Sequence, residues 1–200
     1  MDWIGLDWYA PSHIDIDVSA FLLGHDEKIV REKDFVYYGQ PSSSNFSVKF
    51  DKSMSTIENQ QFIINFPNIP YDVQIISFAL TICDSEINGY SFEEVSKIHL
   101  RIVNGRSQDE MAVFPIDNSF SKESAVVLGT LYRYAGEWKF HAVGARFYGG
   151  LTDLCDTYGV EVDVRPNTQS QNETLTNPTL VSPTQHTKTI RNKKDQLLIL

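Results

Sequence analysis

Cysteines, basic residues and long apolar runs are all scarce in this 200-residue chain. The two cysteines, Cys83 and Cys155, lie far apart and form neither a CxxC pair nor a zinc-type spacing. We therefore expect reduced, buried and unreactive thiols in a cytoplasmic protein. No segment approaches ~18 uninterrupted apolar residues, and the N-terminus lacks a basic stretch followed by an apolar one. We expect neither a membrane span nor export.

The charge balance is acidic. The chain has 17 Lys and Arg against 26 Asp and Glu, which gives a formal net charge of −9. Nucleic-acid binding requires a concentrated basic face, because phosphate contacts supply much of the affinity. The composition therefore argues against nucleic acid as a partner and favours cations, metals included.

The sequence motifs of common enzyme classes are also missing. Gly-x-Ser-x-Gly, HExxH, the P-loop and GxGxxG do not occur. His99 and His141 fall within expected strands, and the other three histidines fall in loops without the spacing of a metal triad. We therefore expect a protein that is not an enzyme.

Instead, the chain is rich in hydrophobic residues, which are arranged in short runs typical of β-strands. Hydrophobic residues make up 42% of it, with 12 Phe, 9 Tyr and 3 Trp, enough for one substantial core. The pattern predicts strands at residues 14–23, 28–31, 34–38, 46–50, 61–66, 73–83, 98–103, 111–116, 124–134 and 137–145. Turn residues separate them at short intervals, which is typical of an all-β, mainly antiparallel β-sandwich.

Two stretches depart from the β pattern and predict short helices. Ser91 is followed three residues later by Glu94, the spacing of a capping box. Residues 150–158 carry apolar side chains at helical spacing, and Gly159 stands where a helix C-cap is expected.

The composition changes after Val164, which divides the chain into a domain at residues 1–164 and a tail at 165–200. Residues 165–189 are mostly Pro, Asn, Thr, Gln and Ser, and cannot bury enough surface to offset the entropy of ordering. We expect a disordered C-terminal tail. Residues 191–200 are a basic cluster followed by Leu-Leu-Ile-Leu, either a frayed end or a short strand that pairs with a partner.

Residues 132–140, Tyr-Arg-Tyr-Ala-Gly-Glu-Trp-Lys-Phe, combine aromatic and basic side chains. Such a combination can stack on nucleic-acid bases. The alternative is a hairpin in which Ala135-Gly136 forms a tight turn and the aromatics pair across the strands. The net negative charge favours the hairpin.

Several phrases occur in an order that resembles the TerD domain of bacterial tellurite-resistance and stress-response proteins. They are residues 15–23 (Asp-Ile-Asp-Val-Ser-Ala-Phe-Leu-Leu), 34–38 (Asp-Phe-Val-Tyr-Tyr) and 131–140, followed by Ala-Val-Gly at 142 and Gly-Gly-Leu at 149. The resemblance covers about residues 3–162. It implies a β-sandwich that binds calcium between loops, acts through other proteins of the same system without catalysis, and reaches membranes only peripherally through a complex.

The resemblance also directs attention to acidic positions that would bind Ca²⁺. They are Asp15, Asp17, Asp51, Glu58 and Asp84. Asp15 and Asp17 share one face of the expected strand, which is costly for like charges unless a cation or hydrogen bonds lie between them. The alternative for this pair is solvation on an exposed face, and for Asp84 it is capping of a turn.

Residues 50–61 depart from the family pattern, because the glycines are lost, Lys52 enters and amides replace acids. Fewer charges weaken calcium binding. Asp34, Asn104 and Glu123 also match family positions, and we expect them to order loops rather than to bind the ion directly. Two hypotheses follow: a calcium-responsive binding module, or a metal-free paralogue that serves as a scaffolding subunit and docks through its tail.

Overall fold

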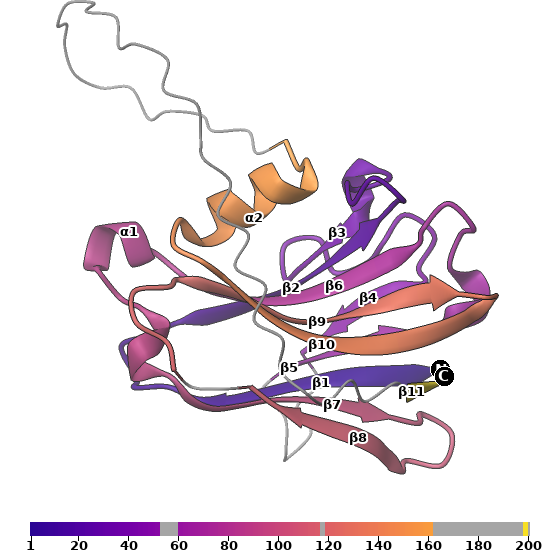
Figure 1. The fold of residues 1–200 in the computed structure, drawn as a ribbon, viewed down its shortest axis with the longest axis horizontal. Helices are drawn as coiled ribbons and strands as arrows, with labels where there is room; N and C mark the ends of the chain where they lie inside the picture. Colours follow the sequence, from indigo (N-terminus) through magenta and orange to yellow (C-terminus); the bar gives the residue numbers. More distant parts are fainter. Residues whose placement is uncertain (53–59, 117–118, 162–197, 200) are drawn as a thin grey trace, which may run out of the picture.

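The computed structural model describes residues 1–52, 60–116, 119–161 and 198–199, and it shows two antiparallel sheets packed face to face (Figure 1). The five-stranded sheet has the order β4-β5-β1-β7-β8, and the six-stranded sheet has the order β11-β10-β9-β6-β2-β3. The predicted β-sandwich is therefore confirmed. Of the tail predicted to be disordered, residues 165–200, the structure describes only Leu198–Ile199, which form a short strand as in the alternative interpretation of the chain end. The rest of that prediction lies outside the described residues.

The element bounds are as follows. The strands of the five-stranded sheet are β1 (Asp2–Tyr9), β4 (Val48–Asp51), β5 (Gln60–Ile64), β7 (Ser96–Val103) and β8 (Glu110–Pro115). Those of the six-stranded sheet are β2 (Ile16–Leu23), β3 (Phe35–Val36), β6 (Ile75–Ile82), β9 (Ala125–Tyr134), β10 (Glu137–Phe147) and β11 (Leu198–Ile199). The helices are α1 (Ser85–Asn88) and α2 (Gly150–Tyr158), with 3₁₀ turns at Glu32–Asp34, Phe66–Asn68 and Phe92–Glu94. No helix among the described residues is long and apolar enough to cross a membrane.

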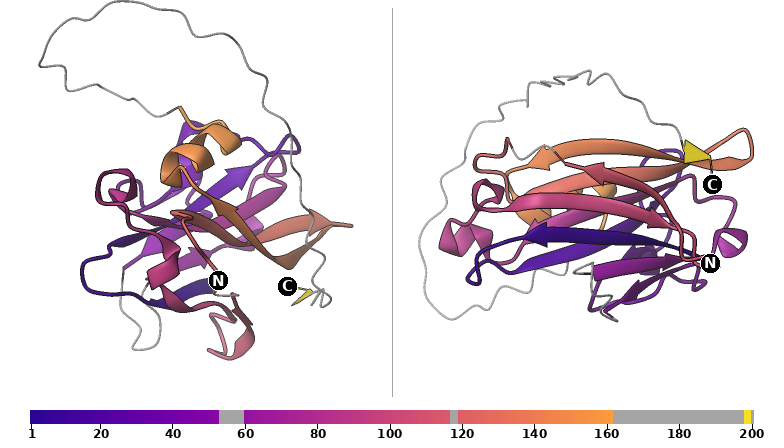
Figure 2. Two further views of the ribbon diagram at one scale, coloured as in Figure 1. Left: turned by 60° about the vertical axis from the view of Figure 1, so that its left-hand side comes forward. Right: turned by 90° about the horizontal axis from the view of Figure 1, so that it is seen from below.

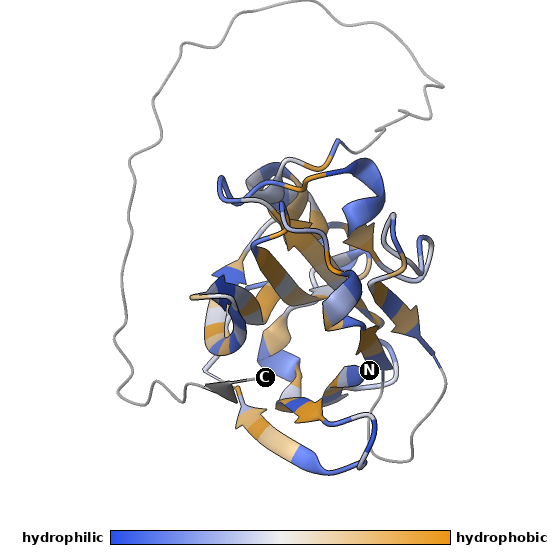
Figure 3. Ribbon diagram, turned by 90° about the vertical axis from the view of Figure 1, so that its right-hand side faces the viewer, coloured by the Kyte–Doolittle hydropathy of each residue, from blue (hydrophilic) through white to orange (hydrophobic). Residues whose placement is uncertain are grey.

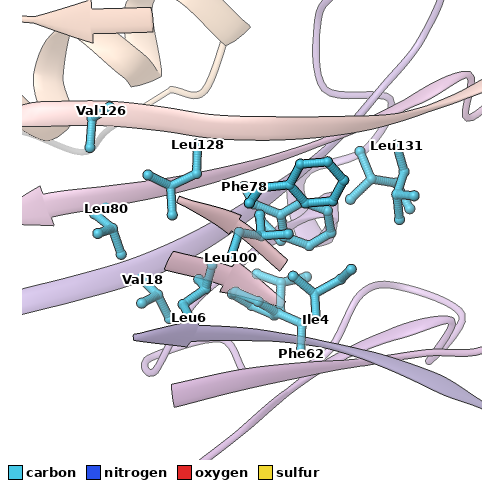
Figure 4. Packing of buried hydrophobic residues seen from close by; sticks show 14 of the residues in the cluster. Ile4, Leu6, Val18, Phe62, Phe78, Leu80, Leu100, Val126, Leu128 and Leu131 are labelled. Carbon is cyan, nitrogen blue, oxygen red and sulfur yellow. The ribbon is translucent and has the colours of Figure 1, made fainter. Parts of the chain in front are cut away.

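The main core lies between the two sheets. Alternate residues of β1, such as Ile4 and Leu6, point toward alternate residues of the opposite sheet, such as Leu80 and Leu128 (Figure 4). Phe62 and Phe78 meet across the gap with ring centroids 5.7 Å apart, tilted by 50°. Burying each such side chain contributes about 1.5–3 kcal/mol. Hydrophobic residues accordingly concentrate on the strands, while the turns are largely polar (Figure 3).

A second, smaller core covers the outer face of the six-stranded sheet, where α2 packs (Figures 1 and 2). Phe21 and Ala79 point outward into it, against Leu154 and Tyr158 of the helix. The buried Tyr158 hydroxyl lies 2.9 Å from Ser77 Oγ and forms a hydrogen bond with it. β2 and β6 are thus buried on both faces, which is why their sequences become continuously apolar.

The hairpin predicted for residues 132–140 is confirmed, but its aromatics do not pair with one another: Trp138 lies opposite Arg133, and Tyr132 lies opposite Lys139. Ala135 and Gly136 connect β9 to β10 with φ values of 52° and 85°. Positive φ at both central residues is the backbone of a type I′ turn, whose twist matches that of the flanking strands. Trp138 and Phe140 then point into the main core.

Other local predictions were wrong. β1 was not predicted, because Gly5 and the two aspartates of this strand are residue types depleted in strands. Residues 28–31 form only one isolated bridge, at Ile29, and residues 34–38 shorten to β3 because Asp34 ends a 3₁₀ turn. Ser91 makes no side-chain capping bond, and only a 3₁₀ turn follows it. The helix at Gly150–Tyr158, ended by Gly159 in a left-handed conformation, is confirmed.

The hydrogen bond between Ser77 and Tyr158 gives a stability prediction. Ser77→Ala or Tyr158→Phe leaves one buried hydroxyl without its partner and should lower the free energy of unfolding by about 1–2 kcal/mol. The double variant should cost less than the sum, because no buried hydroxyl is then unpaired. Urea denaturation measures all three, with exposed Thr152→Ala as the control. Strictly additive losses would contradict this account.

Candidate functional site

Strand pairing brings three of the predicted acids to one end of the sandwich. β2 and β6 pair over eight residues, with Asp17 opposite Thr81 and Ile16 opposite Ile82. The carbonyl oxygen of Asp15 accepts a hydrogen bond from the Cys83 N–H at 3.0 Å, and Asp84 follows directly. We call Asp15, Asp17 and Asp84, with the Cys83 thiol, the acidic cluster. It lies where β1 has ended, β2 begins and α1 follows β6 (Figure 1).

The two β2 acids share the outer face of the six-stranded sheet, as the sequence predicted. Ile16 and Val18 point into the main core, so Asp15 and Asp17 point the other way. Asp15 is exposed and Asp17 is partly buried. Ser19, the next residue on this face, is only 3% exposed, and its hydroxyl has no hydrogen-bond partner among the described residues. The Ser19 hydroxyl oxygen is therefore available as a metal ligand on the same face of the sheet as Asp15 and Asp17.

Cys83 is partly exposed, which corrects the prediction of a buried strand thiol. β6 ends at Ile82, so Cys83 already belongs to the turn. Its Sγ donates a hydrogen bond to Asp17 Oδ2 at 3.1 Å. Partial burial, this hydrogen bond and the charges of the three acids raise the pKa of the thiol to about 12. The thiol is held protonated and is a poor nucleophile.

Tyr38 lies close to the same cluster. Its side chain is 64% exposed, and the negative charge of Asp17 is the main cause of its raised pKa, followed by partial burial and by Cys83. Cys155, by contrast, lies on α2 and is buried in the smaller core as predicted, and burial raises the pKa of its thiol to about 11. Both thiols are therefore in environments that disfavour the reactive thiolate.

Asp51 does not join the acidic cluster. It lies on β4 of the five-stranded sheet, opposite Gln61, whose Nε2 donates a hydrogen bond to Asp51 Oδ2 at 3.1 Å. Val48 and Phe50 pack against the main core, so alternation places Asp51 on the outer face of that sheet. The carboxylates of Asp51 and Asp17 thus belong to opposite outer faces of the sandwich. Glu58 lies outside the described residues.

Of the three supporting residues, Glu123 lies beside the cluster. The carbonyl of its neighbour Ser124 accepts the Ile82 N–H, next to the turn that carries Cys83. The Glu123 carboxylate is buried and accepts the Ser121 N–H at 2.5 Å. Burial alone would raise its pKa, but the hydrogen bonds from the backbone and the charge of Arg146 bring the pKa below its ordinary value. Glu123 therefore fixes the loop that enters β9.

Asp34 and Asn104 order loops away from the cluster. The buried Asp34 carboxylate accepts hydrogen bonds from Ser44 Oγ at 2.8 Å and from Arg31 at 3.1 Å. Asn104 Oδ1 accepts two backbone N–H groups of the β7–β8 loop, at 2.9 and 3.0 Å. Because Val103 pairs with Trp3 at the start of β1, Asn104 lies at the opposite end of the sandwich.

The oxygen chemistry of the acidic cluster suits calcium, but the cluster is not a closed site. Calcium takes six to eight oxygen ligands. Asp15, Asp17 and Asp84 supply carboxylates and Ser19 a hydroxyl, all hard donors. Across the described parts of the chain, no three His, Cys, Asp or Glu side chains are arranged to hold a metal ion. Further oxygens would have to complete the shell.

Sequence comparison settles the family. Residues 3–158 match the family described as TerD domain. The chain belongs to the TerD family. The protein YceE of Bacillus subtilis is 38% identical over 168 residues, covering 80% of this chain and 88% of that protein. Tellurium resistance protein TerD of Serratia marcescens is 37% identical over 165 residues, covering 78% and 86%.

Three further proteins are similar to this TerD-family chain, one by sequence and two by structure. General stress protein 16U of Bacillus subtilis is 34% identical over 168 residues, covering 80% of this chain and 87% of that protein. The crystal structure of a TerD homologue from Streptomyces coelicolor has a TM-score of 0.56 at 14% identity, covering 73% and 89%. That of SAV2460, a protein of unknown function, has a TM-score of 0.61 at 16% identity, covering 80% and 97%. These two similarities show the fold.

The environment of Cys83 gives a reactivity prediction. A thiol pKa near 12 leaves little thiolate at pH 8.5, so iodoacetamide should alkylate Cys83 on the order of a thousandfold more slowly than a free cysteine thiol. The rate should rise about tenfold per pH unit in alkaline solution. Asp17→Asn should accelerate it by removing the charge and the hydrogen-bond acceptor.

Mass spectrometry of a Cys155→Ser chain measures this rate, with Asp109→Asn at the opposite end of the sandwich as the matched control. A rate equal to that of free cysteine, or one indifferent to Asp17→Asn, would contradict the proposed environment.

Proposed function

We propose that this TerD-family protein is a calcium-responsive, non-catalytic binding module of a tellurium-resistance or general stress system. Its relatives carry the names tellurium resistance protein TerD and general stress protein 16U. The observation that carries the calcium part is the acidic cluster, whose three carboxylates lie at one end of the sandwich. The buried Ser19 hydroxyl, two residues further along the same face of β2 than Asp17, has no hydrogen-bond partner among the described residues. A bound Ca²⁺ supplies positive charge and directional oxygen coordination there.

The proposed role of the cation follows from where the cluster lies. Asp15 stands at the end of the β1–β2 connection and Asp84 begins the turn that leads into α1. Their like charges repel one another without a cation, which favours a looser arrangement of both segments. Neutralising Asp15, Asp17 and Asp84 together would draw these segments into one rigid surface. We propose that this surface contacts a partner protein.

The thiols support a binding role rather than catalysis. Nucleophilic catalysis by cysteine requires a depressed pKa, whereas the pKa values of Cys83 and Cys155 are raised to about 12 and 11. Near Cys83 the neighbouring charges are negative, which opposes thiolate formation further. These environments suit structural thiols in a protein that binds but does not transform its partners.

We propose partners from the same stress or tellurium-resistance system, in the cytoplasm. The acidic charge of −9 disfavours nucleic acid and acidic lipid surfaces as direct ligands. Contact with a membrane would then be peripheral and carried by a partner in a complex.

Thermal stability tests the calcium proposal directly. A ligand that binds only the folded state stabilises it, and at 1 mM Ca²⁺ a Kd of about 10 μM would add about 2.7 kcal/mol. For a chain of this size, that corresponds to a rise in Tm of about 5–10 °C between chelator and calcium. Asp15→Asn/Asp17→Asn should abolish the rise.

The matched control is Asp26→Asn/Asp109→Asn, which removes two exposed acids at the other end of the sandwich and should leave the rise intact. Isothermal titration of the same variants measures the binding heat. A wild-type Tm indifferent to calcium would instead favour the metal-free scaffolding subunit. The separation of Asp51 from the cluster and the substitutions at residues 52–61 are the observations that favour this second candidate.

A further inference from the structure

β10 is a long strand at the edge of the six-stranded sheet. β9 pairs with it along one side from Glu137 to Phe147. On the other side, the strand paired with it in the described structure is β11, and only at Lys139 and Phe140. An exposed edge offers a row of backbone N–H and C=O groups to any extended chain.

A β-bulge limits how much of this edge can accept a regular strand. The register with β9 shifts between Ala142 and Ala145, and Gly144 has a φ of 68°. Bulges twist an edge and end regular pairing. The acceptor segment is therefore residues 137–142. Within it Trp138, Lys139 and Phe140 are all at most 9% exposed, so the two positions that pair with β11, Lys139 and Phe140, are buried.

The occupant comes from far along the chain. The described part of the domain ends at Glu161, and Leu198 stands 37 residues later in the sequence. At roughly 3.3–3.6 Å per residue, that length can span more than ~100 Å, so the length of the connection does not by itself force the contact. β11 lies within Leu-Leu-Ile-Leu at 197–200, a short continuous apolar run that is consistent with a buried strand.

Charge also favours the contact. Residues 1–164 hold 24 acidic and 12 basic side chains, a formal charge of −12, whereas residues 165–200 hold 2 acidic and 5 basic ones, a formal charge of +3. Three of those basic side chains, Arg191, Lys193 and Lys194, lie just before the aliphatic run, from which Asp195 and Gln196 separate them. The segment is therefore attracted to the domain that carries the edge.

We propose that the edge of β10 at residues 137–142 is a strand-acceptor site for extended aliphatic peptides, and that residues 198–199 of the same chain occupy it as a tethered plug. Pairing within one chain is favoured over pairing with a second copy, because the tether gives an effective concentration on the order of millimolar. The plug pairs with two of six acceptor residues, so a longer strand can displace it. This inference does not depend on calcium.

Fluorescence anisotropy tests the site with a labelled peptide that has the sequence of residues 191–200. Leu198→Pro/Ile199→Pro in the full chain removes the backbone donors of the plug and should free the edge. This variant should bind the peptide about tenfold more tightly than the wild type, because the tethered competitor is gone. The matched control, Thr187→Pro/Thr189→Pro, should bind like the wild type, and a peptide carrying the two prolines at 198 and 199 should not bind.

Three results would overturn the proposal. The first is no binding of the peptide by Leu198→Pro/Ile199→Pro chains whose circular dichroism matches that of the wild type. The second is equal affinity of all three chains for the peptide. The third is a wild-type dimer in sedimentation equilibrium at micromolar concentration that the two prolines at 198 and 199 abolish, because the occupant would then come from a second copy.

Discussion

The pairing of β2 with β6 is the constraint on which the rest of the structure depends. The two strands run antiparallel over eight residues at the centre of the six-stranded sheet. A slip of one residue would exchange their core and outer faces. Both faces are apolar in the second half of β2, but only one is apolar at its start, where Asp15 and Asp17 lie. The register is therefore fixed by the same residues that place the acidic cluster.

That register explains how the acidic cluster is built from distant segments. Asp17 meets Cys83 across 66 positions of sequence because Ile16 pairs with Ile82. Glu123 joins this end because β9 pairs with β6 on its other side. Asp84 and Glu123 lie far along the sequence from Asp15 and Asp17, and no local motif predicts that these segments meet. Their proximity follows from topology. The negative charges of the acidic cluster add to the partial burial that raises the pKa of the Cys83 thiol, and the charge of Asp17 raises the pKa of Tyr38.

The sandwich, most of its strands and α2 could be predicted from sequence, because alternation and the Gly159 cap are local signals. β1 could not, since its buried pair Ile4 and Leu6 is interrupted by Gly5, and its strand conformation depends on pairing with β5 and β7. Asp15 and Asp17 were correctly expected to share one face. The position of Asp51 on the opposite face was beyond sequence reasoning, because it depends on which sheet contains β4.

The two cores have β2 and β6 in common, and these shared strands couple the unfolding of one core to that of the other. Phe21 and Ala79 support α2 from the outside, while Ala20 and Phe78, their neighbours in the chain, hold the two sheets together. Disturbing either strand therefore loosens the helix and the sandwich at once. The domain should open as a single cooperative unit, so that a change felt at the start of β2 reaches both the sheet interface and the helix that covers it.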